Sequence, residues 1–277
     1  MQQIPTSAII VGMAINVAVL MCFGARLAAI LDAKISPCFL ITITGMTYNS
    51  LLPFRLGEGG KLYCGGAFFH LSVGGLGAAI VMEKFYDLSM LLLLLATLSA
   101  NAHLLFPNVG SPHILGLAIA APLCGLLIFR VRAAGMKDLS RLAILERFGL
   151  NNIAEQAEIL FASQKVVFRA FLTLLIWSVN VSLVLFFFRA VAPEIGFGVL
   201  DAMTLVVIAS LAIAVPVSPA GLGVFEAGIA AYLINFHGLH TEKAISAAAL
   251  HHFVISVPHS AITAVFFSSM FLFRKRT

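Results

Sequence analysis

The sequence predicts an all-α, polytopic membrane protein with two broken or re-entrant helix hairpins related as an inverted repeat. Of its 277 residues, 61% are hydrophobic and only 10% are charged, whereas a soluble domain is about one-quarter charged. Apolar runs near the ~20 residues of a membrane-spanning helix recur along the chain. Two shorter runs end at a proline and continue through glycines and charged residues. We interpret residues 1–277 as a single membrane domain.

The first half, about residues 1–130, contains five apolar runs, of which the second and third are too short for a regular span. In order, they are Ser7–Leu31, Cys38–Leu52, Ala67–Met82, Leu88–Phe106 and Ile114–Phe129. No basic segment precedes the first run, which is therefore predicted to be a retained span and not a cleaved signal peptide. The second run ends at Pro53 and the third at Glu83.

A polar linker of about residues 131–165 precedes the second half, and the helical spacing of its apolar residues predicts an interfacial amphipathic structure. The second half, about residues 166–277, contains the runs Val166–Val191, Ala202–Val215, Val224–Phe236 and Ala244–Phe273. Arg169 and Arg189 lie near the ends of the first of these, where long side chains can snorkel to the membrane surface. Pro216 ends the second run and Pro258 interrupts the last.

Basic residues set the predicted orientation. The linker is rich in arginine and lysine, and the chain ends in Arg274-Lys275-Arg276-Thr277, so we expect both regions to be cytoplasmic and the N-terminus to lie outside. The predicted location is the plasma (inner) membrane of a bacterium. The basic residues are scattered across loops, so the net charge of +5 does not indicate binding to nucleic acid.

The two proline breaks form the candidate site. Proline removes a backbone donor and glycine tolerates irregular backbone, which survives at membrane depth only inside protein or beside a wet cavity. Paired breaks of opposite orientation predict an inverted repeat with a binding site at the midplane. Backbone roles are expected for Pro53, Gly57, Pro219, Gly221 and Gly223, and ligand contacts for Arg55, Glu58, Lys61, Ser218 and Glu226.

Helix N-termini beyond each break present free N–H groups that suit an anion such as phosphate, and arginine can hold phosphate bidentately. The alternative is that both breaks are structural kinks with their charges at the membrane surface.

Two further pairs are candidates for ion or proton binding. Glu83 and Asp87 share a helix face, where they either respond to protons or cations, hold Arg55 from across the bundle, or cap the following span. His251 and His252 lie within an apolar run, so they either mark a proton path or are hydrogen-bonded core residues. No metal-ligand spacing occurs, and we expect neither a metal nor another cofactor.

Three segments, "NSLLPFRLGEGGKL", "VMEKFYDLSMLLLL" and "PVSPAGLGVFEAGIAAYL", resemble the three motifs of the flippase-like lysylphosphatidylglycerol synthase transmembrane family. The matching positions are Asn49, Pro53, Arg55, Gly57, Glu58, Glu83, Asp87, Pro219, Gly221, Gly223 and Glu226. Lys84 departs from the family's usual arginine, and Ala220 from its frequent glycine. The resemblance covers the membrane domain only, because no soluble aminoacyl-transferase domain is recognised.

The resemblance implies a lipid translocase that moves an anionic phospholipid or a polyprenyl-linked (isoprenoid) lipid between leaflets, with Asn49 joining the ligand-binding residues. Its partners would be membrane lipids, and the sequence is silent on oligomeric state. Two alternatives remain open: an intramembrane lipid-modifying transferase with Glu58 or Asp87 as general base, and a scaffold subunit that binds lipid or glycolipid biosynthetic enzymes. Because no nucleophile or cofactor motif is found, we expect a protein that is not an enzyme.

Overall fold

The computed structural model describes residues 5–52, 56–101, 165–214 and 218–274, and these residues form helices joined by turns. Four of the helical segments are long and apolar enough to cross a membrane: Thr6–Leu31, Val166–Val191, Pro219–His237 and Thr241–Ser269. The predicted all-helical membrane fold is therefore confirmed. The run Ile114–Phe129, the amphipathic linker and the basic end Lys275–Thr277 lie outside the described residues.

Over the described residues, each half has the same order of helix lengths. In the first half, the elements are α1 (Thr6–Leu31), α2 (Ile35–Leu51), α3 (Gly57–Phe69) and α4 (Val73–Ala100). In the second, they are α9 (Val166–Val191), η3 (Pro193–Ile195), α10 (Val199–Ala214), η4 (Pro219–Gly221), α11 (Val224–His237) and α12 (Thr241–Arg274). A long helix is thus followed by two short helices with a break between them, and then by another long helix.

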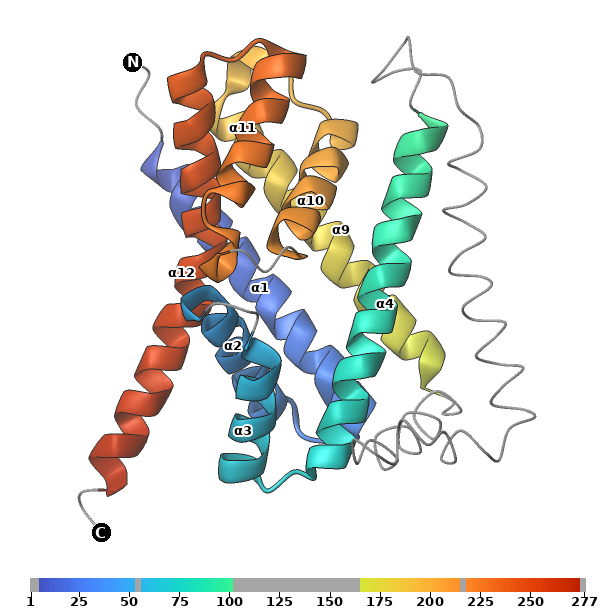
Figure 1. Cartoon of the computed structure of the whole chain (residues 1–277), viewed down its shortest axis with the longest axis vertical. Helices are drawn as coiled ribbons and strands as arrows, with labels where there is room; N and C mark the ends of the chain where they lie inside the picture. The colour runs from blue at the N-terminus through green and yellow to red at the C-terminus, as the bar shows by residue number, and fades with distance from the viewer. Residues whose placement is uncertain (1–4, 53–55, 102–164, 215–217, 275–277) are drawn as a thin grey trace.

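Packing between the helices follows this correspondence. The long helices α1 and α9 pack on each other, and α2 packs on α12 as α10 packs on α4. Within each half, α2 packs on α3 as α10 packs on α11, and the turn η4 contacts α2. In Figure 1, the α2–α3 pair lies below and the α10–α11 pair above, with their broken ends turned toward the middle of the molecule.

Glycines allow α2 and α3 to approach closely. A Cβ atom added to Gly57 would lie 2.1 Å from the backbone oxygen of Gly45, and one added to Gly60 would lie 2.0 Å from Cδ2 of Tyr48. Real Cβ contacts are never this short, so a side chain at either position would force the two helices apart. The glycine cluster after Pro53 therefore packs the first helix pair together.

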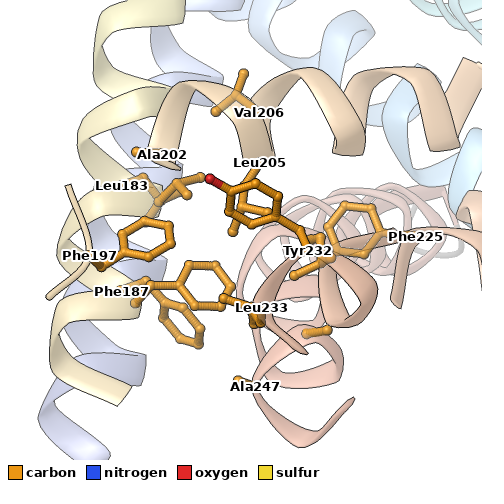
Figure 2. Close-up of a cluster of buried hydrophobic side chains, with 14 of the residues drawn as sticks. Leu183, Phe187, Phe197, Ala202, Leu205, Val206, Phe225, Tyr232, Leu233 and Ala247 are labelled. Carbon is orange, nitrogen blue, oxygen red and sulfur yellow. The ribbon is translucent and has the colours of Figure 1, made fainter. Parts of the chain in front are cut away.

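Apolar packing is strongest in the second half. Figure 2 shows side chains from α9, α10, α11, α12 and the segment before α10 meeting in one cluster: Leu183, Phe187, Phe197, Ala202, Leu205, Val206, Phe225, Tyr232, Leu233 and Ala247. The hydroxyl of Tyr232 leaves this cluster at one edge and donates to Asp201 over 2.7 Å. Because lipid is as apolar as these side chains, close van der Waals packing holds such helices together.

Three expectations about local structure were wrong. The third apolar run does not end at Glu83, because α4 begins at Val73 behind an N-cap at Ser72 and continues through Glu83. The last helix is not interrupted, because α12 remains helical through Pro258. Arg169 does not snorkel; it is buried, and its Nε donates to the backbone oxygen of Ala29 at 3.1 Å.

Candidate functional site

A cavity of about 610 Å³ lies between the two halves and draws its walls from α1, α2, α3, α4, α9, α10, α12 and the turn η4. Its polar and charged lining residues are Asn16, Arg26, Asn49, Ser50, Glu58, Lys61, Glu83, Lys84, Asp87, Trp177, Asn180, Ser210, Ser218, His251, His252, Ser256 and His259. Ionisable side chains buried within a membrane domain are costly, and they mark ion or substrate paths. This cavity is therefore the candidate functional site.

Arg26 on α1 forms the centre of an ionic wall. Its Nη1 donates to Asp87 Oδ1 at 2.7 Å and its Nη2 to Asp87 Oδ2 at 3.1 Å, and Nη2 lies 3.7 Å from Glu83 Oε1. Thr173 of α9 accepts a further bond at 3.3 Å. The two-pronged contact with Asp87 is the strong form of an arginine–carboxylate pair. It compensates a guanidinium that is only 1% exposed.

Lys61 on α3 extends this wall toward the first break. Its Nζ donates to Glu83 Oε2 at 2.8 Å and lies 3.5 Å from Glu58 Oε2. Glu58 Oε1 in turn meets Lys84 Nζ at 2.5 Å. Positive and negative groups therefore alternate from Asp87 through Arg26, Glu83, Lys61 and Glu58 to Lys84. Such alternation lowers the cost of burying Arg26, Glu83 and Lys61, whose side chains are at most 10% exposed.

Within the described residues, three buried atoms of this wall make no hydrogen bond: Arg26 Nε, Glu58 Oε2 and Glu83 Oε1. The two carboxylate oxygens still face cations, at 3.5 Å from Lys61 and 3.7 Å from Arg26. An unsatisfied buried polar group costs about 1–3 kcal/mol. One donor and two acceptors thus remain to be satisfied at the edge of the cavity.

Asn49 closes the first break from the α2 side. Its Oδ1 accepts the backbone N–H of Gly57, the first residue of α3, at 2.7 Å. This satisfies one of the donors that a helix N-terminus leaves free, so Asn49 positions the helix tip. Pro53 and Arg55 lie outside the described residues.

Glu226 closes the second break in a similar way. Its Oε2 accepts the N–H of Gly223 at 2.7 Å, and its Oε1 is hydrogen-bonded to Nδ1 of His252 at 2.6 Å. Gly223 has a φ of +87°, a backbone conformation in which a side chain would be strained. The carboxylate therefore holds the tip of α11 against α12.

The residues of η4 shape the same tip. Pro219 begins the turn, and Ser218 donates from its hydroxyl to the backbone oxygen of Leu222 at 2.8 Å. Gly221 has a φ of +74°, and Ala220 has a φ of +53°, which is strained for a residue with a side chain. Ser218, Ala220 and Gly221 line the cavity.

The histidines of α12 have different surroundings. His252 is hydrogen-bonded to Glu226, whereas neither ring nitrogen of His251 has a partner in the part of the chain that the structure describes. The ring of His251 lies among Phe187, Phe188 and Phe225, with centroids 5.4–5.7 Å away. The expectation of a hydrogen-bonded core histidine thus fits His252 and not His251.

The interpretation of Glu83 and Asp87 as caps of a span was wrong, because both lie within α4, more than two turns after its first residue. Their buried basic partners explain why a helix can carry them there.

Sequence reasoning missed Asn16, Arg26 and Trp177 as site residues. Arg26 lies inside the apolar run Thr6–Leu31, and an arginine within a span normally faces the bundle interior. That signal was available, whereas the contributions of Asn16 and Trp177 depend on packing between distant helices.

A comparison with protein families identifies the lysylphosphatidylglycerol synthase TM region, which matches residues 4–262. Neither a curated protein nor a solved structure matches the chain. The family match extends over most of the chain and includes the helices that line the cavity. The protein therefore belongs to the family of lysylphosphatidylglycerol synthase transmembrane regions and is an integral membrane protein.

Proposed function

We propose that this protein is a lipid translocase, which moves an anionic phospholipid or an isoprenoid-linked lipid between the two leaflets. The observation that carries this proposal is the cavity between two opposed helix tips, with a buried wall of alternating charges on one side. A bundle with a purely structural role does not require a polar cavity, whereas a lipid headgroup that crosses the bilayer does.

The order and packing of the helices support an inverted repeat. The helices α1, α2, α3 and α4 have the same order, similar lengths and corresponding packing contacts as α9, α10, α11 and α12. In this proposal, α2–α3 and α10–α11 are re-entrant pairs that enter from opposite faces of the membrane. Irregular backbone at their tips is then acceptable, because it lines a wet cavity.

The placement of the helix ends supports the proposed orientation. Lys165, just before α9, lies 2.6 Å from Asp32, just after α1, so these two helix ends share one side of the molecule. The end of α12 reaches the same side in Figure 1. We propose that this side is the cytoplasmic face of a bacterial inner membrane and that the N-terminus lies outside.

Among the cavity cations of the described part of the chain, Lys84 is the most accessible. Its side chain is 54% exposed, compared with 1% for Arg26 and 10% for Lys61. Lys84 is bound to Glu58 alone in these contacts, whereas the other two each meet two carboxylates. We expect Lys84 to exchange Glu58 for the headgroup phosphate. Arg55 remains a proposed second phosphate ligand.

Transport in proteoliposomes tests this proposal. The full-length chain is reconstituted with fluorescent phosphatidylglycerol labelled on an acyl chain, and leaflet exchange is followed by chemical quenching from outside. We expect exchange by the wild type and a fall of about tenfold in Lys84→Gln, which corresponds to ~1.4 kcal/mol on the activation barrier. The matched control is Lys165→Gln, which removes an exposed lysine outside the cavity.

Absence of exchange by the wild type, or an equal rate for Lys84→Gln and Lys165→Gln, would contradict the proposal. Mass spectrometry of the same lipids separates a translocase, which leaves them chemically unchanged, from a lipid-modifying enzyme. Activity of the purified chain alone argues against a scaffold that acts only through partner enzymes.

A further inference from the structure

The long helix α12 packs against one helix of each pair, α11 of the second and α2 of the first. Toward its N-terminal end, His252 binds Glu226 of α11 and its ring contacts Phe225 at a centroid distance of 4.4 Å. Toward its C-terminal end, His259 lies 3.0 Å from the hydroxyl of Ser50 on α2. Figure 1 shows α12 passing α11 above and α2 below. Each part of α12 thus contacts a different helix pair.

Further contacts strengthen this division. The hydroxyls of Thr47 on α2 and Thr263 on α12 are 3.0 Å apart, and both residues are buried. The rings of Phe69 on α3 and Phe266 on α12 are stacked, with centroids 6.3 Å apart. The contacts with the second pair therefore lie before Pro258 and those with the first pair after it.

Pro258 weakens the helix between these two parts. Proline has no N–H to donate to the residue four positions earlier, and its ring pushes that carbonyl aside. In α12 the affected carbonyl belongs to Val254, and the neighbouring carbonyl of Ile255 lies on the same disturbed turn. Sharp helix bends occur at such positions.

A side chain of another helix binds this turn. Asn16 on α1 donates from Nδ2 to the backbone oxygen of Ile255 at 2.8 Å and to that of Val254 at 3.4 Å. Asn16 is 4% exposed, so its amide would be costly to bury without these acceptors. Asn16 thus makes its short bond to the carbonyl of Ile255 and a longer contact to the carbonyl of Val254, which is the one left without a helical donor.

We propose that Pro258 is the joint at which α12 bends when the two helix pairs move relative to each other, and that Asn16 is the positioning residue of this joint. The inference rests on the proposed translocase function. Rocking of one pair against the other requires the connecting helix to bend between its contacts with each. Asn16 keeps the carbonyls of Val254 and Ile255 hydrogen-bonded while the turn opens. This lowers the free-energy cost of bending the helix within the membrane.

A double-mutant cycle in the full-length protein tests the link between the two residues without any transport assay. In Pro258→Ala, residue 258 regains its N–H and can satisfy Val254. Asn16→Ala should therefore lower the thermal midpoint by ~2–4 °C in the wild-type background and clearly less in the Pro258→Ala background. Equal losses in both backgrounds would show that Asn16 does not serve the proline turn.

Matched controls exist for both substitutions. Asn235 donates only to Ala231 of its own helix in the contacts described, so Asn235→Ala should show no coupling to Pro258→Ala. Pro193 lies exposed at the start of η3, so Pro193→Ala should leave transport unchanged. We expect Pro258→Ala to slow lipid exchange about tenfold, and a rate equal to that of Pro193→Ala would overturn the proposed joint.

A distance measurement separates failure of the joint from failure of the proposed function. Spin labels replace the exposed residues Ala231 on α11 and Val265 on α12, in a background without the native cysteines. The distance distribution should be broad in the wild type and narrower in Pro258→Ala, whereas identical distributions would refute the joint. A narrowed distribution in a protein that exchanges no lipid would retain the joint and reject the translocase.

Discussion

Replacing Lys61 by methionine tests whether the ionic wall is a network of coupled charges. The ammonium lies 2.8 Å from Glu83 Oε2, and the two side chains are only 10% and 2% exposed. Removing one partner of a buried ion pair leaves an uncompensated charge and costs about 3–5 kcal/mol. Arg26 remains 3.7 Å from Glu83 and continues to offset that charge, so we expect the lower value, ~3 kcal/mol.

Thermal unfolding in detergent is a suitable assay, because the protein has one tryptophan and Trp177 lines the cavity. A cost of ~3 kcal/mol corresponds to a fall in midpoint of roughly 6–12 °C for a chain of this size. Removing both partners, in Lys61→Met/Glu83→Leu, should restore part of this loss, because no uncompensated charge then remains. Lys165→Met, which removes an exposed ion pair with Asp32, should change nothing measurable.

Two results would refute the reasoning. If Lys61→Met unfolds within ~2 °C of the wild type, the cavity admits enough water to solvate Glu83, and the wall is not buried in the sense used above. If the double variant loses the full sum of the two single losses, the two side chains are not energetically coupled.

Three further predictions concern the backbone and the surface. Gly57→Ala should lower the unfolding free energy by ~1–3 kcal/mol because its Cβ would clash with α2, whereas Gly59→Ala, with nothing within 4 Å, should be neutral or stabilising by up to ~1 kcal/mol. Ala220→Gly should raise the thermal midpoint, because it relieves a positive φ that costs about 1–2 kcal/mol. The Lys243 ammonium bound to Glu194 lowers the pKa of that carboxyl. This ion pair therefore stabilises the fold at pH values above the ordinary glutamate pKa, and the stabilisation is lost as pH falls through the lowered pKa. The small difference in unfolding free energy between the wild type and Glu194→Gln, under ~1 kcal/mol, should therefore disappear in acid and persist at neutral pH.

Much of the helical framework could be predicted from hydropathy. The runs Ser7–Leu31 and Val166–Val191 agree with α1 and α9 within a residue or two, because an uninterrupted apolar run leaves few alternatives in lipid. Three of the four short helices, α2, α10 and α11, were also predictable, because proline and glycine fix where a helix ends. The helix α3 was not predicted, since the run Ala67–Met82 covers the end of α3 and the start of α4. Residue identity along the chain carries this information directly.

The course of α4 could not be predicted in the same way. Glu83 and Asp87 predict a membrane surface when the chain is considered alone, since isolated charges are excluded from lipid. In the structure, Arg26 and Lys61 supply the opposite charges from other helices, so the charged turn lies inside the bundle. Only the pairing of residues from distant segments reverses the local preference, and a single sequence without its fold does not show that pairing.

The proposed inverted repeat places the two helix-tip carboxylates in equivalent surroundings with different chemistry. Glu58, near the start of α3, is paired with Lys84 of the following long helix, α4. Glu226, near the start of α11, is paired with His252 of the following long helix, α12. Both carboxylates lie where the helix dipole favours a negative charge. The two tips are therefore built alike and held by different side chains, a lysine at the first and a histidine at the second.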